Sequence, residues 1–367
     1  IKSLFTYIGL NIDSKKLSKF MICKYQNDLE ALVGHLKQLK GQIGYNNLAF
    51  DSQVVEYILI HHKEWLHLDG KEVAGIIYKY AQYCIETANR GDWGDYPEWK
   101  LNIKQLDLFK IWHFNNKAKM TSLKWVEYSM DFHNIEEMSI EHNVEDITEE
   151  EVKGVLGYNE NDVRATYEFY LMTIGQTNHP LYKGIDKVQL RKDIRAEFKI
   201  PCINYNDVKI GDEINKTIYC QLSGIDKKSI KKYGTFREKI KVKDCVRIPI
   251  QFDSEQLRSF YSRFTSTDFN PLKLKDSKGE TFVFKGLEIT FGFGGIHSID
   301  KPRRIDTNDK FYLTDKDCTG MYPRTIIEQQ LYPQHLGPNW YKGCEYIYNK
   351  RANEYKPMAK KDKKAQS

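Results

Sequence analysis

The chain has 367 residues, of which 41% are hydrophobic and 29% are charged. This length allows two or three domains with at least one substantial core. No apolar run reaches about 18 residues, which excludes a membrane-spanning helix. Fifty-six Lys and Arg against 50 Asp and Glu give a net charge of +6, which permits nucleic-acid binding without requiring it.

Cysteine usage and the first residues indicate the cellular setting. Seven cysteines are scattered with no C-x-x-C pair, so we expect a reducing compartment, with neither a disulfide framework nor a zinc site. Residues 1–10 lack the basic start and small-residue cleavage site of a secretory signal. Because no Met stands first, we expect the chain to begin inside a longer protein.

The first half alternates strand-like and helix-like segments. The patterns predict strands over residues 5–12, 43–45 and 106–114, and helices over residues 27–39, 52–65 and 72–88. Thr148 and Glu151 form a capping box that begins a long helix towards Met172. Interleaved strands and helices predict an α/β domain over residues 1–180.

The second half changes character. A helix is expected over residues 188–198, followed by shorter β-like segments. Residues 282–293 alternate apolar and polar side chains, and a strand over 311–313 runs into Asp315 and Asp317. We place domain boundaries near residues 180 and 300.

Charge is unevenly distributed along the chain. Residues 136–151 are strongly acidic, whereas residues 227–243 and 350–364 are basic. The basic segment 227–243 includes Tyr233 and Phe236, and charge interleaved with aromatic rings suits a DNA-binding surface. A solvated loop is the alternative.

The first group of residues with chemical potential is Asn47-Leu48-Ala49-Phe50-Asp51, between an expected strand and an expected helix. A carboxylate at such a junction can reach a metal ion, and Asn47 could hold a phosphate or a sugar. The alternative is that Asp51 is only the N-cap of the helix.

The second group is Tyr158 with Asp162, four residues apart and therefore on one face of a helix. A carboxylate can fix a metal ion while a neighbouring phenol orients a water, as phosphodiester hydrolysis requires. A surface Tyr–Asp pair without function is the alternative.

The third group is Asp317-Cys318-Thr319-Gly320-Met321-Tyr322-Pro323. A carboxylate that ends a strand before a turn and a helix can hold a divalent ion near phosphates. Asp315 and Asp317 would lie on the same face of that strand, so geometry does not choose between them.

Taken in order, the three groups read N-x-x-F-D, Y-x-x-x-D and D-x-x-x-x-Y-P. Together they resemble the second and third exonuclease motifs and polymerase motif A of family B DNA polymerases of phage type. The resemblance covers essentially the whole chain and favours Asp317 over Asp315. It implies an α/β, ribonuclease H-like 3′–5′ exonuclease domain over 1–180, a connecting region with the basic segment over 181–300, and the start of an α+β polymerase palm and fingers over 301–367.

The chain departs from the family pattern in several places. Gly320-Met321 stand where Ser-Leu is usual, and Gly294-Gly295 resemble a template-contacting Y-x-G-G loop with Gly292 at the Tyr position. A Gly-rich β-turn explains that segment equally well. The first exonuclease motif, a D-x-E expected on a strand just before residues 1–10, and polymerase motifs B and C are missing. We therefore expect a fragment that is itself inactive.

The resemblance also implies roles for single residues. Asp51 and Asp162 would bind metal, Tyr158 would orient the water, and Asp317 would bind the polymerase metals. Tyr322 would pack under the incoming deoxyribose and exclude a 2′-hydroxyl. Contacts with DNA are implied for Asn47, Phe50, Lys124, Gly294 and Gly295; for Lys124, which could neutralise a phosphate, a solvated lysine is the alternative.

The resemblance thus predicts a replicative DNA polymerase with proofreading, using two Mg²⁺ per active site, with Mn²⁺ as a substitute. Its partners would be primer-template and single-stranded DNA, deoxynucleoside triphosphates and phage replication proteins, with no membrane, in the cytoplasm of a bacterial host. The alternatives are a stand-alone 3′–5′ nuclease, against which residues 317–323 speak, and a non-catalytic DNA-binding module.

Overall fold

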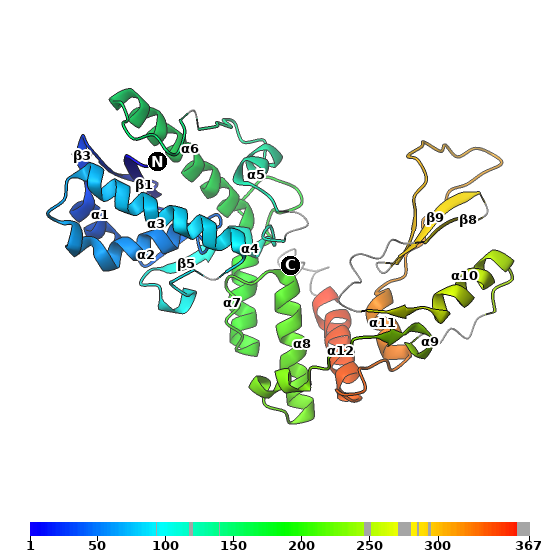
Figure 1. Ribbon diagram of the computed structural model, residues 1–367. Coiled ribbons are helices and arrows are strands. Elements are labelled where there is room, and N and C mark those ends of the chain that lie inside the picture. The colour runs from blue at the N-terminus through cyan, green and yellow to red at the C-terminus, as the bar shows by residue number, and fades with distance from the viewer. Residues whose placement is uncertain are drawn as a thin grey trace. The chain divides into compact units, whose positions relative to one another are not determined.

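The computed structural model describes residues 1–92, 94–116, 120–138, 140–245, 251–270, 280–284, 286–292 and 295–357. Two compact units divide the chain (Figure 1). Unit 1 is Ile1–Leu222 with Gly343–Ser367, and unit 2 is Ser223–Lys342. The mixed α/β architecture predicted from the sequence is confirmed, whereas the functional domain limits at residues 180 and 300 stay a prediction.

Unit 1 begins with strands and continues with helices. Its strands are β1 (Leu4–Leu10), β2 (Leu17–Cys23), β3 (Gln26–Asn27), β4 (Gly41–Gly44) and β5 (Lys104–Asp107). Its helices are α1 (Leu29–Leu36), α2 (Asp51–His61), α3 (Gly70–Arg90), α4 (Leu108–Ile111), α5 (Leu123–Ser129), α6 (Glu149–Thr173), α7 (Lys187–Phe198) and α8 (Asp207–Ser223), with the short turns η1 (His62–Trp65) and η2 (Glu98–Lys100).

Strands β1, β2 and β3 form an antiparallel sheet in that order, with Leu4 opposite Cys23. Side chains alternate between the two faces of a strand. Phe5 and Tyr7 therefore join the cluster made by α1, α2 and α3, whereas Leu4 joins the cluster of α6. Helices cover both faces of this sheet, which holds α6 directly against β1.

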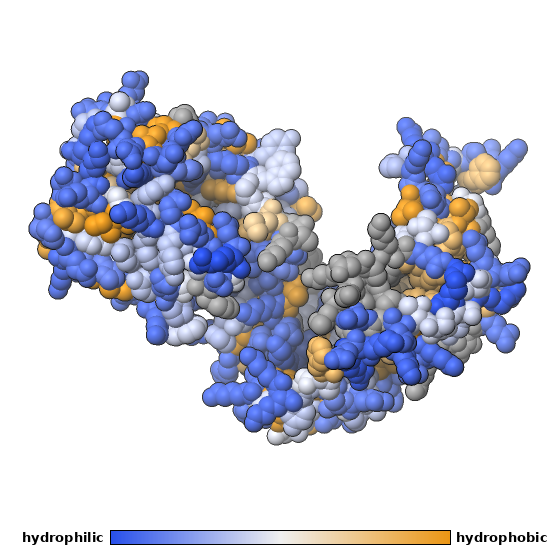
Figure 2. Space-filling view, in the orientation of Figure 1, coloured by the Kyte–Doolittle hydropathy of each residue, from blue (hydrophilic) through white to orange (hydrophobic). Residues whose placement is uncertain are grey.

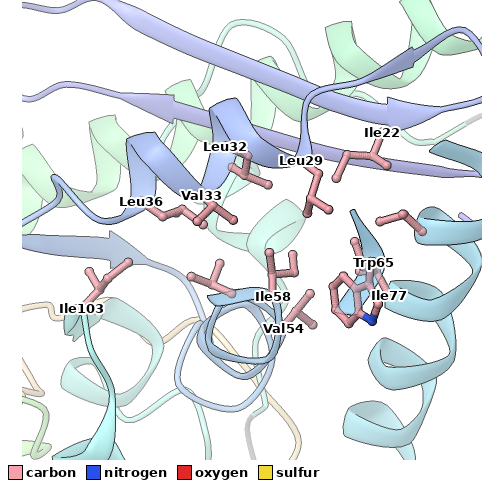
Figure 3. Packing of buried hydrophobic residues seen from close by; sticks show 12 residues of the cluster. Ile22, Leu29, Leu32, Val33, Leu36, Val54, Ile58, Trp65, Ile77 and Ile103 are labelled. Atoms are coloured by element: carbon pink, nitrogen blue, oxygen red, sulfur yellow. The ribbon is translucent and has the colours of Figure 1, made fainter. Parts of the chain in front are cut away.

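The main core lies between the sheet and helices α1, α2 and α3 (Figure 3). Leu29, Leu32, Val33 and Leu36 recur at the helical spacing that predicted α1, and all four are buried. They meet Ile58 of α2, which is fully buried. The helices predicted over 27–39, 52–65 and 72–88 are thus confirmed, because their apolar stripes face one core.

A second, parallel strand pair joins β4 to β5 and sets Gly44 opposite Asp107. The sequence predicted one strand over residues 106–114, and most of that prediction is wrong. The strand ends at Asp107, whose carboxylate accepts a hydrogen bond from the backbone N of Lys110 at 3.3 Å and thereby caps α4. Leu108 and Ile111 belong to α4 instead, and both are buried.

Helix α6 begins where the capping box predicted it. The backbone N of Glu151 donates to the Thr148 hydroxyl at 3.3 Å, and the backbone N of Thr148 donates to the Glu151 carboxylate at 2.8 Å. Val152 and Val155 pack against Leu4 of β1. The Asn159 amide donates to the Thr6 hydroxyl at 3.0 Å, which fixes this face of α6 over β1.

Helix α7 confirms the prediction over residues 188–198. The short β-like segments expected after it occur between residues 240 and 298, but a further helix that the sequence did not predict comes first. Residues 207–223 form α8, on which Ile210, Ile214 and Ile218 repeat at helical spacing. The buried guanidinium of Arg191 on α7 donates to the Asp207 carboxylate at 2.8 Å. Tertiary contacts of this kind stabilise a helix over the β-like structure expected here.

The rest of the C-terminal part contains α12 (Asn339–Lys350) and the π-helical turn η6 (Arg351–Tyr355). Gly343 of α12 is buried and lies against Ile218 of α8. Lys350 forms an ion pair with Glu197 of α7. Residues far apart in sequence thus complete unit 1.

Unit 2 has short strands and helices. They are η4 (Lys227–Tyr233), β6 (Ile240–Lys241), α9 (Val242–Cys245), α10 (Glu255–Ser266), β7 (Asp268–Phe269), β8 (Glu280–Phe284), β9 (Leu287–Gly292), β10 (Gly295–Ser298) and α11 (Met321–Glu328). The alternating run over 282–293 is two paired strands, β8 and β9, because Gly286 turns the chain with a φ of 80°. Phe260 of α10 packs on Phe291, with ring centroids 4.4 Å apart.

The strand predicted over residues 311–313 is wrong. Phe311 makes a single bridge, to Asn308, and Tyr312 and Leu313 are exposed. A strand is stable only when a neighbour pairs with it along its length, and none of the described residues does so here.

Hydrophilic side chains dominate the face of the molecule shown in Figure 2, with apolar residues in separate groups. Among the described residues, no helix combines the length and the apolar character needed to cross a membrane.

Candidate functional site

A pocket of about 620 Å³ opens in unit 1 between β1, the loop after β4 and helix α6. Asp51, Tyr158 and Asp162 all line it. These are the three residues that the sequence selected for the exonuclease-like site, and Asp51 lies more than 100 residues before the other two. Asn47 and Phe50 also line the pocket.

Hydrogen bonds to Asp107 fix the loop that places Asp51 at the pocket. The buried Asp107 carboxylate accepts hydrogen bonds from the backbone N of Asn46 at 3.1 Å and of Leu48 at 3.2 Å. Asn46 has a φ of 59°, in the left-handed region, so the turn needs such external support. Asp107 therefore connects the end of β5 to the start of the site.

Asn47 has a structural position within this loop. Its side chain is buried, and its amide donates to the Gln105 side chain at 2.8 Å. A β-carbon at residue 44 would lie 2.7 Å from the Asn47 β-carbon, so only glycine fits there. Among the described residues, the buried Asn47 Oδ1 has no hydrogen-bond partner. The predicted contact of Asn47 with DNA stays a prediction.

The N-cap alternative for Asp51 is wrong by one position. Phe50 is the N-cap of α2 and makes no side-chain cap bond, and Asp51 is the first helical residue. A carboxylate in the first turn is still favoured by the helix dipole. Asp51 remains accessible because the pocket is open, yet protein surrounds it, and this desolvation raises the pKa of Asp51 to about 6. The charge of Asp107 raises it further.

Tyr158 and Asp162 lie one turn apart on α6, as predicted from their spacing. Tyr158 is partly buried, and burial together with the charge of Asp162 raises the pKa of its phenol. A phenol held neutral beside a carboxylate can donate or accept a hydrogen bond to a water in the pocket.

Lys124 on α5 contacts both of these residues. Its Nζ lies 2.5 Å from the Asp162 Oδ1 and 4.6 Å from the centroid of the Tyr158 ring. Lys124 is therefore not the solvated lysine that one alternative assumed. Burial lowers the pKa of Lys124, but the ion pair with Asp162 outweighs it and the net direction is upward.

Glu127 completes this cluster and was missed by the sequence reasoning. Its side chain is fully buried, and the Lys124 Nζ lies 3.3 Å from it. Burial raises the pKa of Glu127, although Lys124 opposes the shift. The i,i+3 spacing of Lys124 and Glu127 on a helix was the available signal. Asp107 was missed as well, and its signal was a carboxylate at the end of a short strand.

Asp51 and Asp162 are the residues of this pocket that could hold a divalent cation. Mg²⁺ is commonly held by one or two carboxylates together with water and substrate phosphates, and Asp51 and Asp162 supply two carboxylates to one cavity. The ammonium of Lys124 shows that the Asp162 carboxylate accepts a cation. Among the described residues, no three His, Cys, Asp or Glu side chains are grouped closely enough to bind a metal by themselves.

The predicted polymerase residues lie in unit 2. Asp317 and Asp315 are exposed in an irregular segment, and Tyr322 is exposed on α11. Gly320, with a φ of 63°, begins that helix, so the turn-then-helix part of the prediction is confirmed. The strand expected before Asp317 is absent from the described residues of this segment.

The glycine loop is only partly described. Gly294 lies outside the described residues. Gly295 begins β10 with a φ of 130° and pairs with Gly292 of β9, a conformation that favours glycine. This pairing agrees with the β-turn alternative, and contacts with DNA at Gly294 and Gly295 stay predictions.

Comparison with protein-family models, curated proteins and solved structures found no match for this chain. Any functional assignment therefore depends on the sequence motifs and on the geometry of the pocket.

Proposed function

We propose that this chain is part of a family B DNA polymerase of phage type, with a ribonuclease H-like 3′–5′ exonuclease domain and the beginning of a polymerase palm. One observation carries the proposal. Asp51, Tyr158 and Asp162, chosen by motif resemblance alone, come from two distant segments and line a single pocket.

The strand order supports the ribonuclease H-like assignment. An antiparallel β1–β2–β3 sheet is followed by α1, then β4, two helices and a β5 parallel to β4. Helices pack on both faces of the first sheet. The β4–β5 pair is a separate sheet, and the loop after β4 and helix α6 bring Asp51 and Asp162 to one pocket.

In the proposed reaction, Asp51 and Asp162 would hold Mg²⁺ or Mn²⁺, which supplies charge stabilisation and lowers the pKa of a bound water. Tyr158 would orient the attacking water through its phenol. Lys124, half-buried beside Asp162, would stabilise negative charge on the phosphate as it develops. Single-stranded DNA with a free 3′ end is the proposed substrate.

The polymerase part of the proposal depends on Asp317 and Tyr322. Asp317 would share two metal ions with a second carboxylate on another strand, and Tyr322 would select deoxyribose by excluding a 2′-hydroxyl. Asp315 cannot replace that second carboxylate, because it belongs to the same segment as Asp317. We therefore propose that these 367 residues do not extend a primer unaided. The roles of dNTPs, phage replication proteins and the bacterial cytoplasm are parts of the same proposal.

A digestion assay tests the exonuclease proposal. The chain and, if the gene encodes a D-x-E before Ile1, the extended protein are incubated with 5′-labelled single-stranded DNA and Mg²⁺. We expect the extended protein to shorten the DNA from its 3′ end, Asp162→Ala to abolish this, and the chain alone to act slowly. Robust Asp162-dependent digestion by the chain alone would contradict the need for a D-x-E. Undiminished digestion by the extended Asp162→Ala protein would refute the site.

A primer-extension assay tests Asp317 separately. The chain and the full gene product are compared, each as wild type and as Asp317→Ala. Extension by the chain would refute the requirement for a second carboxylate. Undiminished extension by the mutant gene product would refute the role of Asp317.

A non-catalytic DNA-binding module is the second candidate, and one observation favours it. The basic segment 227–243 exposes Lys231, Lys232 and Phe236 to solvent. Charge with an exposed ring can bind single-stranded DNA without any catalysis. Absence of 3′ digestion together with salt-sensitive DNA binding would select this candidate.

A further inference from the structure

Glu127 is a buried carboxylate with one ionic partner among the described residues. Its side chain has no exposed surface. Oε1 accepts a hydrogen bond from Lys124, and Oε2 belongs to the same ion pair but has no hydrogen bond among the described residues. The partner is Lys124, whose Nζ lies 3.3 Å away. At 3.3 Å both contacts are longer than a close charge-assisted hydrogen bond, so the buried Glu127 carboxylate can accept the ammonium at a shorter distance.

Lys124 is shared between two carboxylates. Its ammonium lies 2.5 Å from Asp162 and 3.3 Å from Glu127, so the closer pair occupies the carboxylate that the proposed function assigns to the metal. A metal ion that binds Asp162 must displace this ammonium. In a half-buried position, an ammonium released with no other acceptor would be costly.

We propose that Glu127 is a positioning residue: it is the second acceptor for Lys124 and takes its ammonium when Asp162 binds a divalent cation. This inference rests on the proposed function and deepens it. The exchange leaves Lys124 charged and beside Asp162 and Tyr158, which line the pocket where a substrate phosphate would bind. Glu127 thereby lowers the cost of loading the metal.

The local geometry allows this exchange without a backbone movement. Lys124 and Glu127 lie three residues apart on α5 and therefore on one side of the helix. The Tyr158 ring, 4.6 Å from the ammonium, offers a cation–π contact beside the pair. Rotation of the lysine side chain is sufficient to move its charge from one acceptor to the other.

A double-mutant cycle on Mn²⁺ binding tests the proposal. Free Mn²⁺ is measured by electron paramagnetic resonance with wild type, Glu127→Gln, Lys124→Met and the double variant. We expect Glu127→Gln to weaken Mn²⁺ binding about threefold to tenfold, which corresponds to a coupling of about 0.6 to 1.4 kcal/mol. Lys124→Met should strengthen binding, and the double variant should match Lys124→Met, because Glu127 acts only through the lysine.

A matched control separates this exchange from a general effect of negative charge. Glu160 lies two residues before Asp162 on α6 and pairs with Lys19 and Arg164 instead of Lys124. Glu160→Gln should weaken Mn²⁺ binding equally with Lys124 or Met at position 124. If Glu127→Gln also weakened Mn²⁺ binding equally with Lys124 and with Met at position 124, the proposal would be overturned.

Two further variants keep the outcomes distinct. If Glu127→Gln does not fold, Glu127→Asp keeps the charge but withdraws it by one methylene, and it should weaken binding only while Lys124 is present. Asp162→Asn should remove the Mn²⁺ site. Binding that is unaffected by Asp162→Asn would refute the proposed function itself, whereas Asp162-dependent binding without coupling between Glu127 and Lys124 would refute only the present inference.

Discussion

Replacement of Asp107 should weaken unit 1 and release the loop that carries Asp51. The Asp107 carboxylate is fully buried and accepts backbone hydrogen bonds from Asn46, Leu48 and Lys110 at 3.1, 3.2 and 3.3 Å. In Asp107→Ala these three N–H groups lose their acceptor. The variant therefore tests whether one carboxylate holds both the loop and the start of α4.

The expected loss follows from these contacts. A buried N–H without an acceptor costs about 1–3 kcal/mol, and two such groups lie in the loop. Loss of the α4 cap adds about 0.5–2 kcal/mol. Burial raises the pKa of Asp107, so its ionised form is itself unfavourable, and the net loss should be about 3–5 kcal/mol. Asp107→Asn retains one acceptor oxygen and should lose about 1–3 kcal/mol.

Hydrogen exchange measured by mass spectrometry is a suitable assay, because peptides from unit 1 report that unit alone. We expect faster exchange in the peptide containing Asn46 and Leu48, more in Asp107→Ala than in Asp107→Asn. Urea unfolding followed by tryptophan fluorescence gives the free energy of unfolding. A linear dependence of that free energy on urea is assumed for each transition.

Asp69 offers a matched control. Its carboxylate is exposed and caps α3 by accepting a hydrogen bond from the backbone N of Glu72 at 2.9 Å. Asp69→Ala removes a cap without uncovering buried donors and should lose about 1 kcal/mol. If Asp107→Ala costs no more than Asp69→Ala, or leaves exchange in the loop unchanged, the reasoning about Asp107 is refuted.

Three other predictions concern charge, packing and DNA. Because the surrounding protein desolvates the accessible Asp51 carboxylate and raises its pKa from 3.8 to about 6, its ionised form opposes folding at high pH. Asp51→Asn should therefore raise Tm at pH 8 but not at pH 3.5, and an equal rise at both would contradict this. A β-carbon at Gly70 would lie 2.2 Å from a β2 carbonyl, whereas a β-carbon at Gly75 would meet no atom within 4 Å. In thermal unfolding, Gly70→Ala should therefore destabilise the protein by about 1–3 kcal/mol, and Gly75→Ala should stabilise it by about 0.5–1 kcal/mol. The reverse order would refute the packing argument. Replacing Lys231 and Lys232 by Gln should lower the log–log salt slope of single-stranded DNA binding by roughly 1.4, measured by fluorescence anisotropy, and an unchanged slope would favour the solvated-loop alternative.

Local patterns identified most helices of unit 1. The apolar repeat in 27–39 and the capping box at Thr148 and Glu151 are signals contained within a few turns, and both α1 and α6 formed where these signals predicted. Helix capping and amphipathic spacing depend on neighbouring residues. The sequence also determined that Tyr158 and Asp162 share a helix face.

Elements whose state depends on distant partners were predicted poorly. Residues 106–114 read as a strand, yet Asp107 ends β5 and caps α4. Residues 311–313 have strand-forming side chains but no pairing neighbour among the described residues. Helix α8 was missed although Ile210, Ile214 and Ile218 repeat at helical spacing, and contacts such as that between Arg191 and Asp207 stabilise it. Strand propensity reflects packing and pairing more than the backbone itself.

For the candidate site, the sequence by itself determined the residue types: Asp51, Tyr158 and Asp162 stand out by spacing and by motif. Only the tertiary structure decided that they line one pocket. It also decided that Lys124 forms an ion pair with Asp162 and lies close to the carboxylate of Glu127. The physical reason is the sequence distance over which the interactions act. Spacing along one helix fixes which side chains share a face, but contacts between β1, the loop after β4, α5 and α6 depend on how the apolar faces of these elements pack together.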